Sequence, residues 1–530
     1  MSSRPVSVVQ LREWLHDGQE IAIIDVSEGG PFADAHILVA SNVPPAQIEV
    51  SLPALVPRRA TRLVITSSDG SDTRNVANLL ASSGYSQVFV LDGGNMAWNA
   101  AGYRLFSGSN IVSKAFGELV EKECDTPHIE AEELSQWLNN KKDFYLFDSR
   151  PLAEFRTVSL PGGTDCPGAE LVYRVSGAVN NPNLPIVVNC AGRTRSIIGA
   201  QSLREAGFPN PVFALKNGTM GWQIAGYTVE TGKSNVLPEP ASEGLSLAIK
   251  RAREVAARHN IRFVSFEEAQ ALCSDSDRTT YLFDVRQPDV YARGHVAGSI
   301  NAPGGQLVQA TDMFVAVRNA RLVLVDDHCV QSVMTAHWLS RMGWDVYVLH
   351  DAGVHMTETG LELGASLRHP HSDVRTVNVR KLHELMEIGE CDVIDVGESY
   401  WYRQGRIPKS WYSKRASLQQ ALQRFAVDRP LIFVCTHGAT SPFAASDAID
   451  FGFSDVSVLE GGRTAWRQQG NTVETIDMDD DNFLLSATDD MWYPPWSRKD
   501  GVREAMIEYL TWEVGLTELV AEETYLSFEI

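Results

Sequence analysis

The chain has 530 residues, of which 44% are hydrophobic and 21% are charged, and its formal net charge is -21 at pH 7. A chain of this length is expected to form three or four domains, because a single hydrophobic core stops growing well below this size. The strong negative charge argues against nucleic acid or an anionic membrane surface as a partner. No stretch approaches the ~20 consecutive apolar residues that cross a bilayer, so we expect no membrane partner.

Cysteine usage and the N-terminal residues indicate the compartment. Seven cysteines occur without any Cys-x-x-Cys pair, which favours reduced thiols over a disulfide framework. Residues 1–6 lack the long apolar core of a signal peptide, so we expect a soluble cytoplasmic protein. The histidines show no zinc-ligand spacing and no Gly-x-Gly-x-x-Gly fingerprint occurs, so we expect no metal and no cofactor. The oligomeric state stays open, a homo-oligomer included.

One pattern of predicted elements occurs four times along the chain. Each copy begins with a short apolar strand that ends in aspartate, and an aromatic-rich segment and a turn follow it. A second apolar strand, a helix that ends at glycine and a third apolar strand come next. Three copies close with a glycine four residues before a tryptophan, which we interpret as a core residue. These tryptophans are Trp98, Trp222 and Trp466.

Near-continuous apolar strands that alternate with helical periods predict an α/β fold with parallel sheets and helices on both faces. The expected domains are residues 5–106, 126–232, 261–366 and 374–476. Residues 241–260 have helical periodicity and predict a linker helix between the two halves. Residues 477–530 form a tail, in which residues 502–519 predict an amphipathic helix that packs on its own chain.

The second copy carries the most informative loop. Val187 and Val188 predict the end of a buried strand, and Ser196 opens an apolar-periodic helix, so Cys190 lies just before a helix N-terminus. Backbone N–H groups converge there, and the helix dipole favours negative charge. Arg193 and Arg195 act in the same direction, so we expect this thiol to ionise readily. Such a loop suits either sulfur transfer or phosphoryl transfer.

The order of motifs around this loop resembles the rhodanese (thiosulfate sulfurtransferase) family. The motifs are Asp148-x-Arg150, Glu154-Phe155, Pro161-Gly162, the loop from Cys190 to Arg195, and Gly218 before Trp222. The resemblance covers roughly residues 5–475 as four tandem rhodanese-like domains. It implies a persulfide mechanism, in which a thiolate takes the outer sulfur of thiosulfate and passes it to cyanide or a thiol.

The resemblance also implies roles for individual residues of the second copy. Cys190 would be the nucleophile and sulfur carrier, and Arg195 and Arg193 would bind the sulfonate of thiosulfate. Arg150 would assist at the pocket edge, and Asp148 would orient that arginine. The expected substrate-binding residues are Ala191, Gly192, Thr194, Ser196, Arg150 and Asp148.

The equivalent positions of the other copies are Ser67, Asp326 and Cys435. The first loop, residues 67–72, carries acidic residues instead of arginine, so we expect it to be inactive. In the third copy Asp326 and its neighbour Asp327 would repel thiosulfate, and we also expect inactivity there.

The fourth copy keeps Cys435 and the loop length but loses both arginines. His437 could supply part of the positive charge, and Arg403 and Arg406 are expected near the pocket rim. A second active or sulfur-accepting site at Cys435 and His437 stays open, as does a residual cysteine.

Three functions compete on the sequence alone. The first is a thiosulfate sulfurtransferase that acts through a Cys190 persulfide. The second is a persulfide relay or sulfur-carrier protein that acts with a partner. The third is a phosphatase, which the loop disfavours because related phosphatases use a loop one residue longer. 3-Mercaptopyruvate remains open as a donor, although the two arginines favour the dianion thiosulfate.

Overall fold

The computed structural model describes residues 4–68, 70, 73–360, 364–477, 480 and 482–530. The chain divides into two compact units. One unit comprises residues 1–12, 22–109 and 363–500, and the other comprises residues 13–21, 110–362 and 501–530. The first unit therefore holds most of the first and fourth copies. The second unit holds the second and third copies together with the C-terminal residues.

Each copy forms a sheet of short parallel strands. In the second copy the strand order is β6-β10-β9-β7-β8, in the third β11-β17-β16-β12-β14, and in the fourth β19-β23-β22-β20-β21. In the first copy β1, β5, β4 and β2 are neighbours in that order, and β3 pairs with β2. The strands are β1 (Arg4–Val6), β2 (Ile21–Asp25), β3 (Ser41–Asn42), β4 (Arg62–Thr66), β5 (Val88–Leu91), β6 (His128–Ile129), β7 (Tyr145–Asp148), β8 (Thr164–Asp165), β9 (Ile186–Asn189), β10 (Val212–Leu215), β11 (Arg262–Val264), β12 (Thr280–Asp284), β13 (His295–Val296), β14 (Ile300–Asn301), β15 (Val317–Arg318), β16 (Arg321–Val325), β17 (Asp345–Leu349), β18 (Met356–Glu358), β19 (Arg375–Val377), β20 (Asp392–Asp395), β21 (Trp411–Tyr412), β22 (Leu431–Val434) and β23 (Val456–Leu459).

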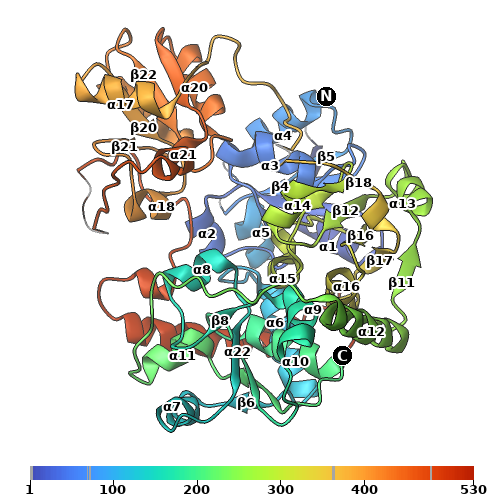
Figure 1. The fold of residues 1–530 in the computed structure, drawn as a ribbon. Helices are drawn as coiled ribbons and strands as arrows, with labels where there is room; N and C mark the ends of the chain where they lie inside the picture. Colours follow the sequence, from blue (N-terminus) through green and yellow to red (C-terminus); the bar gives the residue numbers. More distant parts are fainter. Residues whose placement is uncertain (1–3, 69, 71–72, 361–363, 478–479, 481) are drawn as a thin grey trace. The chain divides into compact units, whose positions relative to one another are not determined.

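Helices connect these strands, as a right-handed parallel fold requires. Figure 1 labels many of them. The α-helices are α1 (Val8–His16), α2 (Gly29–Asp34), α3 (Ile48–Leu55), α4 (Thr73–Ser82), α5 (Gly94–Ala100), α6 (Ile111–Glu123), α7 (Ala131–Asn139), α8 (Leu152–Thr157), α9 (Leu171–Ala178), α10 (Thr194–Glu205), α11 (Gly218–Ile224), α12 (Ser242–Arg258), α13 (Phe266–Cys273), α14 (Pro288–Arg293), α15 (Gly304–Gln309), α16 (Gln331–Arg341), α17 (Val379–Glu387), α18 (Ser399–Gln404), α19 (Leu418–Ala421), α20 (Ser441–Asp450), α21 (Gly462–Gln468) and α22 (Val502–Ala521).

The central strands are buried along their whole length, which explains their continuous apolar sequences. Every residue of β9, β16 and β22 is buried. A strand that is covered by helices on both faces has no solvent side and therefore needs no polar alternation. The three repeated tryptophans lie in the core, at 1–3% exposure, and each indole N–H donates to a backbone carbonyl six residues further along the chain. Their interpretation as core residues is confirmed.

Two details differ from the sequence prediction. The sequence pattern missed short strands in every copy, because strands of two or three residues carry no measurable periodicity. They are β1 and β3 in the first copy, β6 and β8 in the second, β11, β13, β14, β15 and β18 in the third, and β19 and β21 in the fourth. Helix α10 begins at Thr194, two residues before the expected start at Ser196. The Ser196 hydroxyl donates to the Arg193 carbonyl at 2.8 Å, so Ser196 lies inside the first helical turn.

The C-terminal residues form the predicted helix, α22. It packs beside α6 and α11 within its own unit, and α22 and α6 lie side by side in Figure 1. Met506, Leu510 and Leu516 are buried on its inner face. The linker helix α12 packs in turn on α9 and α16.

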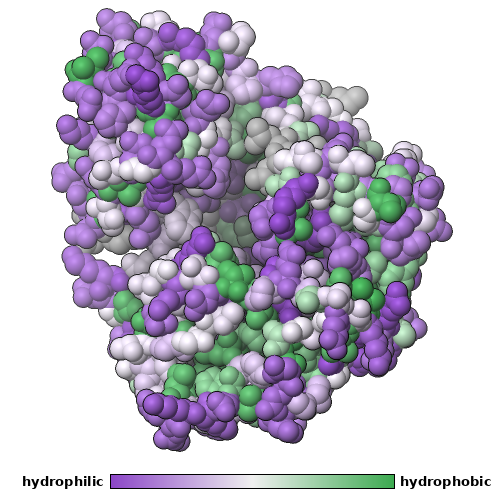
Figure 2. All heavy atoms as spheres, in the orientation of Figure 1, coloured by the Kyte–Doolittle hydropathy of each residue, from purple (hydrophilic) through white to green (hydrophobic). Residues whose placement is uncertain are grey.

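Much of the surface is hydrophilic. Hydrophilic residues predominate on the face that Figure 2 shows, with hydrophobic residues in patches among them. Within the part of the chain that the structure describes, no helix combines the length and the apolar character that crossing a bilayer requires.

Candidate active site

The Cys190 loop lies between the carboxyl end of β9 and the N-terminus of α10. Helix α11 fixes its backbone, because the N–H groups of Thr219 and Met220 donate to the carbonyls of Cys190 and Ala191 at 2.8 and 2.9 Å. This contact requires glycine at position 218. Its φ is +55°, and a Cβ there would lie 2.5 Å from the Cys190 carbonyl oxygen. The repeated glycine before tryptophan therefore positions the loop.

Asp148 and Arg150 support the loop from below. The Arg150 guanidinium donates to both carboxylate oxygens of Asp148, at 2.8 and 2.7 Å, and to the Val158 carbonyl at 2.7 Å. The Asn189 amide donates to the same carboxylate at 2.7 Å. All these side chains are buried, so the pair forms a rigid base under the sheet edge. Asp148 does orient Arg150, but Arg150 is buried and does not lie at the pocket edge as the sequence analysis expected.

The Cys190 thiol is more buried than the sequence pattern indicated. The residue is 2% exposed, and Sγ donates to the Ser196 hydroxyl at 3.5 Å. Burial raises the pKa of this thiol, while Arg195 and the hydrogen bonds with Ser196 lower it and Glu513 raises it further. Together these effects raise the pKa of Cys190. The expectation that this thiol ionises readily therefore does not hold while α22 covers the loop.

Arg193 points into a clamp of carboxylates. Its guanidinium donates to Glu118 at 2.6 and 2.7 Å, forms a further ion pair with Glu121, and donates to the Asn217 side chain at 3.0 Å. Glu118 and Glu121 belong to α6, which precedes the second copy. Arg193 therefore fixes the loop to α6 and has little donor capacity left for an anion.

Arg195 is the cation with the largest effect on the thiol. Its positive charge lowers the pKa of Cys190 more than any other neighbouring group does. Its two terminal nitrogens donate to the Glu154 carboxylate at 2.7 and 2.8 Å, and one of them also donates to Gln306 at 3.3 Å. An incoming anion would have to compete with Glu154 for this guanidinium.

Helix α22 covers the loop from the outside. Glu513 accepts a hydrogen bond from the Thr194 hydroxyl at 2.8 Å and is itself buried. Leu510 and Met506 form an apolar cluster with Met220 next to Gly192. This cover could not be predicted from the sequence, because Glu513 and Thr194 lie 319 residues apart and no local motif links them.

The third copy fills its own anion cradle. The Asp326 carboxylate accepts the backbone N–H groups of Val330 and Gln331 at 2.9 and 3.1 Å and the Ser332 hydroxyl at 2.5 Å. These are the donors that would otherwise hold a thiolate or an anion. Burial and the Asp326 charge raise the pKa of Cys329 to about 12, so this thiol stays protonated.

The first copy has a buried serine at the equivalent position. Ser67 is 3% exposed, and nearby Asp25 is held by Ser27 and Asn95 rather than by an arginine. Of the acidic loop at 67–72, residues 69, 71 and 72 lie outside the described residues.

Cys435 of the fourth copy is in a different environment from Cys190. It lines a cavity of about 490 Å³, together with the exposed His437. The Gly438 N–H donates to Sγ at 3.2 Å, and Sγ donates to the Ser441 hydroxyl at 3.5 Å. Sequence reasoning expected Arg403 and Arg406 at the rim, but they bind the Asp477 carbonyl and the Glu474 carboxylate. Neither arginine lines the cavity.

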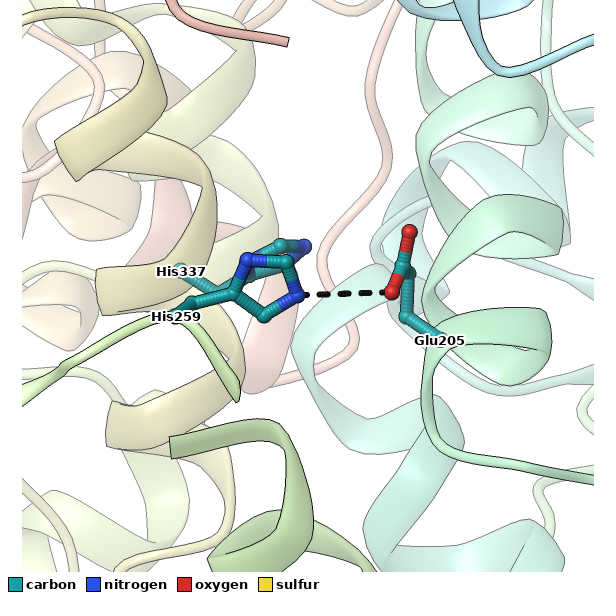
Figure 3. A group of neighbouring side chains, drawn as sticks. All are labelled: Glu205, His259 and His337. Atoms are coloured by element: carbon teal, nitrogen blue, oxygen red, sulfur yellow. Dashed lines mark hydrogen bonds and ion pairs between the residues drawn. The ribbon is translucent and has the colours of Figure 1, made fainter. Parts of the chain in front are cut away.

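One group of side chains has the donor types of a metal site. Ligand atoms of Glu205, His259 and His337 lie within 4.8 Å of one another, and His259 Nε2 is 3.4 Å from Glu205 (Figure 3). Arg258 lies 3.1 Å and Arg341 4.0 Å from the same carboxylate. Two guanidinium groups already neutralise Glu205, which raises the free-energy cost of adding a cation. We assign no metal here.

Comparisons with known proteins agree with this geometry. The family described as "Rhodanese-like domain" matches residues 7–101, 130–225, 265–352 and 378–469. The chain belongs to the rhodanese family of sulfurtransferases and contains four tandem rhodanese-like domains.

The similar proteins include one over the full length. The crystal structure of a thiosulfate sulfurtransferase from Pseudomonas aeruginosa is 38% identical, with 99% of each chain covered and a TM-score of 0.88. Proteins named thiosulfate sulfurtransferase GlpE match over the length of a single domain, and two of them serve as examples. The one from Pseudoalteromonas translucida is 32% identical over 17% of this chain and 86% of its own length. The one from Shewanella oneidensis is 29% identical over 18% and 96%.

Proposed function

We propose that this protein is a thiosulfate sulfurtransferase whose reaction takes place at Cys190. The observation that carries the proposal is the combination of a thiol, the N-terminus of α10 and Arg195 in one loop. The equivalent loops present Ser67, Asp326 or an arginine-free Cys435 loop instead. The thiosulfate sulfurtransferase names of the relatives support the same substrate.

The reaction has two balanced steps. The Cys190 thiolate attacks the outer sulfur of thiosulfate, a Cys190–sulfur bond forms, and the sulfur–sulfur bond of thiosulfate breaks to release sulfite. Cyanide or a thiolate then attacks the terminal sulfur of the persulfide anion and leaves with it, which regenerates the Cys190 thiolate. Backbone amides of residues 191–196 stabilise the negative charge in both states.

The arginines have different roles in this proposal. Arg195 exchanges Glu154 for the sulfonate of thiosulfate and holds it by charge-assisted hydrogen bonds. Arg193 stays paired with α6 and keeps the loop in position. Asp148 and Arg150 hold the base of the loop. Because α22 covers the thiol, thiosulfate enters when α22 moves away, and the closed helix shields the persulfide from water.

Replacement of the nucleophile tests the proposal. Cys190→Ser is expected to abolish thiosulfate:cyanide turnover, while Cys166→Ser, at a buried thiol of the same domain, keeps it. Unchanged turnover in Cys190→Ser would refute the assignment. Hydrolysis of an aryl phosphate that depends on Cys190 would instead favour the phosphatase alternative.

A further inference from the structure

The cavity above Cys435 is built by three segments of one compact unit. Glu28 and Gln47 come from the first copy, Glu398 and Tyr412 from the fourth, and Asp490 from the segment that follows it. At about 490 Å³ the space is within the range of small-molecule sites. It is far larger than an ion of the size of thiosulfate needs.

Specific contacts hold these walls together. The backbone N–H groups of Gly29 and Gly30 donate to the carbonyls of Asp490 and Asp489 at 3.0 and 2.9 Å. A Cβ on Gly29 would lie 2.6 Å from the Asp490 carbonyl oxygen, so glycine is required for this approach. Arg415 bridges Glu49 of the first copy and Asp447 of the fourth. The first copy, which has Ser67 at the cysteine position, thus forms part of the cavity at Cys435 of the fourth copy.

Cys435 lies where a nucleophile would be activated. It follows β22 and precedes α20, and the Gly438 N–H already contacts its sulfur at 3.2 Å. Amide groups at a helix N-terminus stabilise a thiolate and a persulfide anion. Arg463 lies behind the loop, where it pairs with Asp395 and donates to Thr436 at 2.9 Å. It does not line the cavity.

The outer part of the cavity has a negative field. Burial and the charge of Asp490 raise the pKa of Glu398. Burial, followed by Asp490 and Glu28, raises the pKa of Tyr412 well above its usual range. The cations on the wall are already paired, since Lys414 contacts Asp489 at 2.5 Å and Arg415 contacts Glu49 at 2.8 Å. This field disfavours a dianion such as thiosulfate.

The carboxylates of the cavity wall favour a ligand that carries donors and positive charge. Glu398 and Asp490 both line the cavity, beside Tyr412. Asp490 accepts the Ser399 backbone N–H at 2.8 Å and interacts with the Tyr412 hydroxyl. An ammonium group supplies three donors together with the charge that complements these carboxylates.

We propose that Cys435 is a second sulfur-exchange site, whose cavity binds a small organic thiol that carries an ammonium group. The sulfur end lies at the Gly438 amide and the ammonium group lies among Glu398, Asp490 and Tyr412. The Cys435 thiolate attacks the outer sulfur of the aminothiol persulfide. A Cys435–sulfur bond forms, the sulfur–sulfur bond of the persulfide breaks, and the aminothiol leaves as its thiolate.

Cys190→Ser protein tests this proposal independently of the reaction at Cys190. It is incubated with cysteamine persulfide, hydroxyethyl persulfide or mercaptopropionate persulfide, each made from the matching disulfide and sulfide. Peptide mass spectrometry then measures the rate at which Cys435 gains one sulfur atom. The same protein unfolded in urea gives the intrinsic reactivity of each reagent. The rate measured for the folded protein is divided by the rate measured for the unfolded protein with the same reagent.

The corrected rates are expected to fall in the order cationic, neutral, anionic. The preference for the cationic over the anionic reagent should fall about fivefold in Glu398→Gln and in Asp490→Asn, the size of one partly screened charge interaction. Glu387→Gln, at an exposed carboxylate on α17, should leave it unchanged. The proposal is overturned if Cys435 gains no sulfur while the exposed Cys273 does. It is also overturned if the folded protein prefers the cationic over the anionic reagent no more than the unfolded protein does.

Discussion

At the scale of single residues, the ionisation of Cys190 controls the proposed reaction. Burial raises the pKa of this thiol, and Glu513 on α22 adds to the increase. Only the thiolate attacks sulfur, so the thiolate fraction limits the rate at neutral pH. Activity should therefore rise about tenfold per pH unit across the neutral range and level off only above the ordinary thiol pKa.

Removal of the Glu513 charge should shift this profile. Glu513→Gln keeps an oxygen that can accept from Thr194 but removes the negative charge, so the pKa of Cys190 falls. We expect turnover at pH 7 to rise about threefold and the pH profile of kcat/KM to move to lower pH by about half a unit. Glu508→Gln, at an exposed position of the same helix, is the matched control. A profile that moves to higher pH would contradict the electrostatic role of Glu513.

The two loop arginines should respond differently to the same substitution. Arg195→Gln removes the group that binds the sulfonate, so KM for thiosulfate should rise at least tenfold while the protein remains folded. Arg193→Gln leaves Glu118 and Glu121 without their partner, and stability should fall by about 3 kcal/mol. Steady-state kinetics and thermal unfolding of both variants distinguish these effects. Equal KM values for thiosulfate in the two variants would argue against the assignment of sulfonate binding to Arg195.

The sequence identified the residues of the loop but not their partners. Cys190, Arg193 and Arg195 stand within six positions and form a local motif that can be read directly. Glu118 precedes Arg193 by 75 positions, and Glu513 follows Thr194 by 319. Long-range partners of this kind leave no periodic signal, so the burial of the thiol and the clamp on Arg193 could not be predicted.

At the scale of elements, helix α22 acts as a cover over the active loop. Leu510 lies in the apolar cluster with Met220, next to Gly192. Leu510→Ala should weaken the closed state by about 2–5 kcal/mol, which increases the population with α22 displaced. Alkylation of Cys190 by iodoacetamide should then be at least about tenfold faster.

Ile507→Ala, at a position of α22 that is 39% exposed, provides the control for this variant. Its alkylation rate at Cys190 should equal that of the natural protein. If Leu510→Ala also leaves that rate unchanged, α22 does not control access to the thiol.

The contact between α11 and the loop makes a second prediction at this scale. Gly218→Ala places a Cβ against the Cys190 carbonyl and should displace the loop, with a loss of turnover of about 100-fold. Gly226→Ala has the same backbone strain, because its φ is +85°, but nothing lies within 4 Å of its Cβ. Gly226→Ala should therefore cost only about 1 kcal/mol of stability and keep its turnover. Equal turnover in both variants would contradict the positioning role of Gly218.

The order of elements was largely predictable because buried parallel strands have a strong apolar signature. The central strands, the helix after each loop, the linker helix and α22 were all expected from periodicity. The edge strands were missed because two or three half-exposed residues carry no pattern. The start of α10 was placed two residues late, since the apolar run begins inside the helix rather than at its first residue.

At the scale of the whole molecule, the four related domains differ in what they contribute to the proposed chemistry. The third domain fills its own cradle with Asp326, and the first has Ser67 in place of the nucleophile. The first domain nevertheless forms one wall of the cavity at Cys435. Repeats identify the four domains, but they do not indicate which of them share a compact unit. That the first domain joins the fourth came from the structure alone.

In the proposed reaction, thiosulfate deposits sulfur on Cys190. Mass spectrometry can follow all seven cysteines after the protein is incubated with thiosulfate and the excess is removed. We predict a gain of the mass of one sulfur atom at Cys190, and its loss when cyanide is added. If Cys190 stays unmodified while the protein turns over thiosulfate and cyanide, the assignment of Cys190 as the sulfur carrier is wrong.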